Sequence, residues 1–114
     1  MECWPSRKGI GLAKEYDIHL PRSDNDGVPI EKRKIRQVGA LLLEFFGAVT
    51  FFPQENKGWW TMQGVTFRDS IVIYRVVTNR TKAARAFLRK LKEELKRDVR
   101  QEEILIVEKE ARTI

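Results

Sequence analysis

The strongest hydrophobic pattern in the chain is the run at residues 69–78, which reads Asp-Ser-Ile-Val-Ile-Tyr-Arg-Val-Val-Thr. It is rich in β-branched residues and apolar at both odd and even positions, with the single charge of Arg75 at its centre. Strands that are apolar on both sides are typical of positions covered on both faces. The pattern therefore predicts a strand in the interior of a sheet.

Other segments carry shorter strand patterns. Residues 15–20 alternate apolar and polar side chains up to Pro21, as a half-buried strand does. Further strands are predicted at residues 48–52, 59–62, 65–68 and 103–107. The two in the middle flank Gln63 and Gly64, and a glycine at this place permits the tight turn of a β-hairpin.

Two segments have the period of an amphipathic helix. Apolar residues recur at spacings of three and four over residues 30–46, and Gly47 supplies a C-terminal stop. Gly39 lies on the buried face of this helix, where a glycine permits close approach to a sheet. A second helix is predicted at residues 82–97 by Ala84, Phe87, Leu88, Leu91 and Leu95 on one stripe.

The order of these elements is strand, helix, strand, hairpin, helix, strand. It predicts an α+β fold of the ferredoxin-like split βαβ kind: an antiparallel sheet with an extra β-hairpin and two helices on one face. In that topology residues 70–77 lie beside residues 16–20 in the centre. We expect a single domain at residues 15–114, preceded by an N-terminal arm at residues 1–14.

Several short segments stand out as motifs: Tyr-Asp-Ile-His-Leu-Pro at 16–21, Asn-Asp-Gly-x-Pro-Ile at 25–30, Phe-Gly-Ala-Val-Thr at 46–50, Gly-Trp-Trp at 58–60 and Gln-Glu-Glu-Ile at 101–104. Together they resemble a small prokaryotic protein family that has no established activity. The resemblance covers the chain from about Tyr16 onward. It implies one compact domain that begins near that residue.

Composition narrows the class of protein. The 114 residues are 42% hydrophobic and 33% charged, as in an ordinary globular protein, and no apolar run is long enough to span a bilayer. No secretory h-region is visible in residues 1–14, so we expect a cytoplasmic protein. The lone Cys3 can form no internal disulfide. We find no metal-binding or phosphate-binding motif and expect no metal or cofactor.

Positive charge is concentrated in the second predicted helix. The net charge is +6, and residues 80–100 hold nine basic and three acidic residues, which accounts for all of it. Arg85, Arg89, Lys92 and Lys96 share a stripe opposite the apolar one. Such a stripe can follow a nucleic-acid backbone. It is more often a solvated helix face, on which Glu93 balances part of the charge.

A polar group is predicted on the side of the sheet that the helices leave uncovered. Asp17 and His19 share one side of the first strand, and Arg75 lies on the neighbouring central strand. One interpretation is a metal or acid–base site, although a metal usually takes three or four protein ligands. The other is an Asp17–Arg75 ion pair with His19 hydrogen-bonded in a sheet surface or dimer interface.

Trp59 and Trp60 are consecutive on a hairpin strand, so they must point to opposite faces. We expect one to be buried and the other exposed. An exposed tryptophan can stack on a base or anchor a protein partner, whereas a buried one covers the end of the core.

An antiparallel sheet with both helices on one face leaves an apolar second face that favours burial against another subunit. The sequence therefore predicts a non-enzymatic protein-association module that forms homo-oligomers through its sheet face. The alternative is a nucleic-acid-binding protein that uses the second helix. A third hypothesis is a small-molecule enzyme with a sheet-face pocket at Asp17, His19 and Arg75.

Overall fold

The computed structural model describes residues 11–24, 26–101 and 103–114. Four strands form one antiparallel sheet in the order β2-β3-β1-β4. The strands are β1 (Gly11–Pro21), β2 (Thr50–Met62), β3 (Val65–Thr78) and β4 (Leu105–Thr113). The run at residues 69–78 lies inside the sheet, paired with β1 on one side and β2 on the other. This confirms the placement predicted from its apolar pattern.

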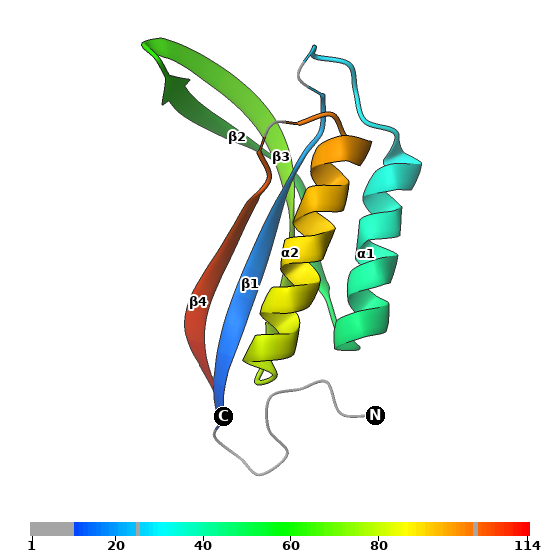
Figure 1. The fold of residues 1–114 in the computed structure, drawn as a ribbon, viewed down its shortest axis with the longest axis vertical. Coiled ribbons are helices and arrows are strands. Elements are labelled where there is room, and N and C mark those ends of the chain that lie inside the picture. The colour runs from blue at the N-terminus through cyan, green and yellow to red at the C-terminus, as the bar shows by residue number, and fades with distance from the viewer. Residues whose placement is uncertain (1–10, 25, 102) are drawn as a thin grey trace.

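Two helices, α1 (Lys32–Phe46) and α2 (Thr81–Asp98), cover one face of the sheet (Figure 1). The core lies between this face and the helices. Strands β1 and β3 supply Tyr16, Ile18, Leu20, Val72, Tyr74 and Val76, and Ile104 joins them from just before β4. The helices supply Ile35, Val38, Leu42, Phe46, Ala84, Leu88, Leu91 and Leu95. The helical stripes predicted from the sequence are therefore the buried ones.

Gly39 brings α1 close to β3. A Cβ atom at this position would lie 2.8 Å from the hydroxyl oxygen of Tyr74 and 2.9 Å from its ring. The Tyr74 hydroxyl donates a hydrogen bond of 2.8 Å to the carbonyl oxygen of Ile35, which fixes the ring under the helix. The close approach predicted for Gly39 is confirmed. The helix then ends at Gly47, whose φ of 81° lies in the left-handed region, as predicted.

The structure corrects three predicted boundaries. β1 begins at Gly11, so residues 11–14 belong to the sheet and not to the predicted N-terminal arm. The closing strand runs from Leu105 to Thr113 because it pairs with β1 from Gly11 to His19. Residues 48–49 precede β2. Cys3 and Asn25 lie outside the described residues.

The hairpin is not a separate pair of strands. β2 and β3 run on from the sheet into it, with an irregular register between Phe52 and Asn56. We call residues 56–71 the distal hairpin. It extends beyond the helices (Figure 1), and no residue from 50 to 71 belongs to the core cluster among the described residues. Of the helices described, neither is both long and apolar enough to cross a membrane.

Candidate functional site

The face of the sheet opposite the helices carries the predicted polar group. Residues directly opposite each other on neighbouring strands share a face, so the pairing register gives the layout of this surface. We call it the open face. It is made of Glu15, Asp17 and His19 on β1, Ile73, Arg75 and Val77 on β3, Leu105, Val107 and Lys109 on β4, and Thr50 and Phe52 on β2.

Arg75 and Asp17 form a bidentate ion pair at the centre of the open face. Arg75 Nε donates to Asp17 Oδ1 at 2.8 Å, and Nη2 donates to Oδ2 at 3.0 Å. Glu15 forms ion pairs with Arg75 at 3.3 Å and with Lys109 at 3.2 Å, and Lys109 lies 3.8 Å from Asp17. Two carboxylates and two cations thus neutralise one another. The predicted Asp17–Arg75 ion pair is present in the structure.

The pKa values of Asp17 and His19 are both lowered, by pairing and by burial respectively. The hydrogen bond from Arg75 lowers the pKa of Asp17, although burial opposes the shift, and Asp17 is only 6% exposed. Burial lowers the pKa of His19, against the attraction of Asp17, so the imidazole is neutral at neutral pH. Among the described residues we find no hydrogen bond to the His19 ring, so the one predicted for it stays a prediction.

Apolar side chains surround the charged group. His19 lies between Leu105 and Ile73 in the register, and Phe52 follows Ile73 in the same row. The guanidinium carbon of Arg75 lies 4.9 Å from the centre of the Phe52 ring, a cation–π arrangement. The apolar side chains of this face flank the charged group, and we call them the apolar rim: Phe52, Ile73, Val77, Leu105 and Val107. The charged group that they flank is electrically neutral.

The third hypothesis required a pocket on this face. The structure contains a groove between the helices and a hollow of about 610 Å³ beside the distal hairpin, and neither is lined by Asp17, His19 or Arg75. In the part of the chain that the structure describes, no three His, Cys, Asp or Glu residues are grouped to hold a metal ion.

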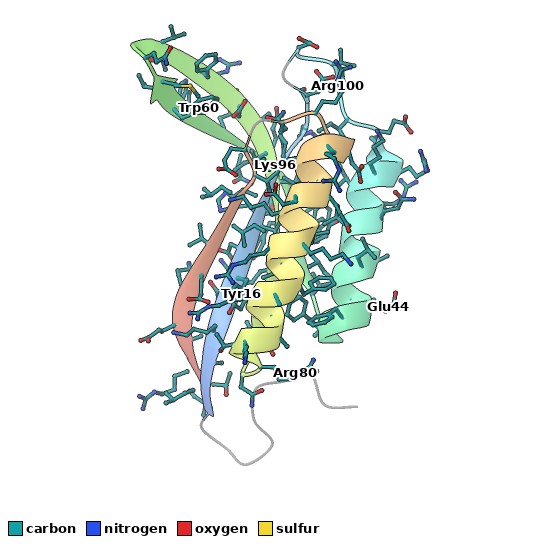
Figure 2. All side chains as sticks on the ribbon, in the orientation of Figure 1. Tyr16, Glu44, Trp60, Arg80, Lys96 and Arg100 are labelled. Atoms are coloured by element: carbon teal, nitrogen blue, oxygen red, sulfur yellow. The ribbon has the colours of Figure 1, made fainter. Side chains whose placement is uncertain are left out.

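Both tryptophans of the distal hairpin are exposed, Trp59 by 63% and Trp60 by 42%, so the prediction that one would be buried is wrong. They do point to opposite faces. Trp60 stacks on Phe67 with ring centres 4.5 Å apart, and its Nε1 donates to Asp69 at 2.7 Å. Figure 2 places Trp60 on the part of the hairpin that the helices do not reach, which is why no core covers either ring.

Most of the basic stripe on α2 is paired with acidic residues. Arg85 makes a two-pronged ion pair with Glu108 of β4, with both nitrogen–oxygen distances 2.7 Å. Lys92 lies 2.9 Å from Glu103, and Lys96 lies 3.7 Å from Glu93. Arg89 is exposed and has no ion pair among the described residues. The stripe therefore offers less unpaired charge to a nucleic acid than its sequence suggests.

Sequence reasoning missed the part that β4 plays. Glu108 also accepts a hydrogen bond of 2.8 Å from the hydroxyl of Tyr16, and Lys109 completes the charged group on the opposite face. Side chains along a strand point alternately to its two faces. Extending the predicted strand beyond Val107 would therefore have placed Glu108 and Lys109 on opposite faces. The distal hairpin residues Phe67 and Asp69, which contact Trp60, were also not singled out.

Comparison of the chain with protein-family models, curated proteins and solved structures finds no match. The assignment of function therefore rests on the geometry described above.

Proposed function

We propose that this protein is a protein-association module that forms a homo-oligomer, in the simplest case a dimer, through the open face. The observation that carries the proposal is the combination of an apolar rim with a charged centre that is already neutralised. Covering this face with a second copy removes apolar area from water without leaving any of the four charges unpaired.

The distal hairpin extends the surface available for association. Met62, Val65, Trp60 and Phe67 share one side of the hairpin by register and by the stacking of the two rings. This side is continuous with the open face, because every second residue of a strand lies on the same face. The residues of β3 that connect the two are Val65, Phe67, Asp69, Ile71 and Ile73. Exposed apolar clusters of this kind are typical of protein interfaces.

We also propose that the fold is the ferredoxin-like split βαβ arrangement. The element order of strand, helix, strand, strand, helix, strand supports this assignment, as does the strand order β2-β3-β1-β4. The long β2–β3 hairpin is the elaboration that sets this chain apart from the simplest form of that fold. The resemblance to a small prokaryotic family stays a prediction.

Sedimentation equilibrium of the full chain tests the proposal. We expect a mass of twice 13.4 kDa or a higher multiple at micromolar concentration. Leu105→Arg places a cation in the apolar rim at a side chain that is 55% exposed, so the fold should be retained. Burying that unpaired charge should weaken association by at least about 30-fold.

Leu43→Arg is the matched control, because Leu43 is 50% exposed on α1 and lies outside the open face. It should leave the dissociation constant unchanged. A monomeric mass for the unaltered chain would contradict the proposal. So would an equal weakening of association by both substitutions.

The other two hypotheses have weaker support. The ion pairs to Glu103, Glu108 and Glu93 reduce the case for nucleic-acid binding through α2. A sheet-face enzyme would need a pocket at Asp17, His19 and Arg75, and neither hollow described above is lined by them. The pairing of Asp17 with Arg75 also argues against proton transfer by Asp17.

A further inference from the structure

The two faces of the distal hairpin differ in chemistry. Successive cross-strand pairs along the hairpin point their side chains to opposite sides. Three pairs therefore lie on one side and three on the other. One side carries the pairs Lys57–Ser70, Trp59–Arg68 and Thr61–Thr66, and the other carries Gly58–Asp69, Trp60–Phe67 and Met62–Val65. The hydroxyls of Thr61 and Thr66 lie 3.2 Å apart, which confirms that they share a side. We call the first set the basic face of the hairpin.

Every side chain of the basic face is a cation, a hydroxyl or an aromatic ring. Glu55 is an acidic neighbour whose carboxylate accepts a hydrogen bond from the hydroxyl of Ser70, and Asp24 and Asp69 also line the hollow beside the hairpin. Arg22, Lys57 and Arg68 all lie near enough to Glu55 to help lower its pKa, after the larger effect of Ser70. The face itself carries two cations, Lys57 and Arg68, against the single carboxylate of Glu55. Its net charge is therefore positive, which suits a polyanion.

Trp59 adds a flat apolar surface to these cations. It is 63% exposed, lies directly opposite Arg68, and makes no ring contact or hydrogen bond with any described residue. An aromatic ring that stands beside phosphate-binding cations is the usual platform for an unpaired base, and each stacked base is worth about 1–3 kcal/mol.

We propose that the basic face of the distal hairpin binds single-stranded nucleic acid, with Trp59 stacked on a base and Arg22, Lys57 and Arg68 contacting the backbone phosphates. This site is separate from α2 and does not depend on association through the open face. A single strand fits better than a duplex, because the faces of paired bases are already stacked and give Trp59 no surface. A protein partner is better suited to the apolar side of the hairpin.

Fluorescence anisotropy of a labelled fifteen-nucleotide oligothymidylate, titrated with the full chain, tests the proposal. We expect binding at low salt, and three phosphate contacts predict a slope of about −2 in a plot of log affinity against log salt concentration. Arg68→Gln should make that slope shallower by about 0.7. Trp59→Ala should weaken binding by about 5- to 160-fold and leave the slope unchanged.

Arg89→Gln is the matched control, since it removes an exposed cation from α2, and it should not change the affinity. Circular dichroism should show that Trp59→Ala folds normally. The absence of binding at low salt would overturn the proposal. So would equal affinity for a duplex or an oligoglutamate of the same length, or a loss of binding in Arg89→Gln that Trp59→Ala does not cause.

Discussion

At the scale of single residues, Glu108 joins three elements. Its carboxylate binds Arg85 of α2 through both oxygens and accepts the hydroxyl of Tyr16 on β1. The hydrogen bond from Arg85, followed by that from Tyr16, lowers the pKa of Glu108 from 4.5 to about 2. Burial, helped by Glu108, raises the pKa of Tyr16 to about 12. Both groups therefore keep one protonation state over a wide range of pH.

The shift of Glu108 predicts how stability depends on acid. A carboxylate with a lower pKa in the folded state than in the unfolded state contributes stability above pH 4.5 and loses that contribution as pH falls toward 2. Thermal unfolding between neutral pH and pH 2 should therefore show a smaller acid-induced fall in Tm for Glu108→Gln than for the unaltered chain.

Glu110→Gln serves as the control for this prediction. Glu110 lies two positions further along β4 and pairs with Lys14 at 3.2 Å. Its removal should leave the acid dependence close to that of the unaltered chain, and Asp17 titrates in all three proteins. An unchanged acid-induced fall in Glu108→Gln would contradict the role given to this cluster.

At the scale of elements, the distal hairpin is held by its own strands and turn. Gln63 and Gly64 both have positive φ, 51° and 81°, as a two-residue turn of the type I′ class requires. Its residues add nothing to the described core cluster. An isolated two-stranded hairpin is at most marginally stable in water, so this one depends on continuing from β2 and β3.

Replacing residues 58–69 by Asn-Gly should therefore leave the domain folded. The substitution keeps the Lys57–Ser70 pair and closes it with a two-residue turn. We expect the free energy of unfolding to change by less than about 1 kcal/mol, or about 4–8 °C in Tm. Oligonucleotide binding should be lost, because Trp59 and Arg68 are removed.

Leu42→Ala gives the scale for that measurement, since Leu42 is fully buried and its truncation should cost about 2–5 kcal/mol. A hairpin replacement as damaging as Leu42→Ala would show that residues 58–69 support the core after all.

Patterns along the sequence were enough to predict the parts of the fold that have one clear period. The interior strand at 69–78, both helical stripes and the close approach at Gly39 are examples. The Asp17–Arg75 ion pair followed from placing the two central strands side by side. The sequence predicted separate strands at 48–52 and 59–62, whereas the structure has one strand, β2, across this stretch with an irregular register.

Exposure on the hairpin could not be predicted in the same way. Alternation shows that Trp59 and Trp60 point to opposite sides, but burial depends on whether another layer lies over either side. That depends on where α1 and α2 end in space. The pairing of α2 with Glu103 and Glu108 likewise depends on how far β4 runs beside β1, which the apolar run at 103–107 did not reveal.

At the scale of the whole molecule, the two proposed surfaces use different physical interactions. The open face is apolar with a neutral centre, so association through it should persist at high salt. The basic face of the hairpin relies on unpaired cations, so its binding should weaken steeply as salt rises. The alternation of side chains along β2 and β3 keeps the two surfaces on opposite sides.

Single substitutions should therefore separate the two activities. Leu105→Arg should give a monomer that binds the oligothymidylate with unchanged affinity per chain. Trp59→Ala should keep the oligomeric mass and lose affinity for the oligonucleotide. Sedimentation and anisotropy on both variants check this directly. If each substitution abolished both activities, the two surfaces would be one site.

The pairing of β1 with β4 has a consequence for how the chain is made. Gly11 lies opposite Thr113, so the first described strand finds its second neighbour only when residues 105–113 have been synthesised. Until then β1 can pair with β3 on one edge, while its other edge stays open to other chains. Contacts so distant along the chain also close slowly, which prolongs this exposure. The newly made protein therefore passes through a stage in which the open edge of its central strand β1 can pair with other chains.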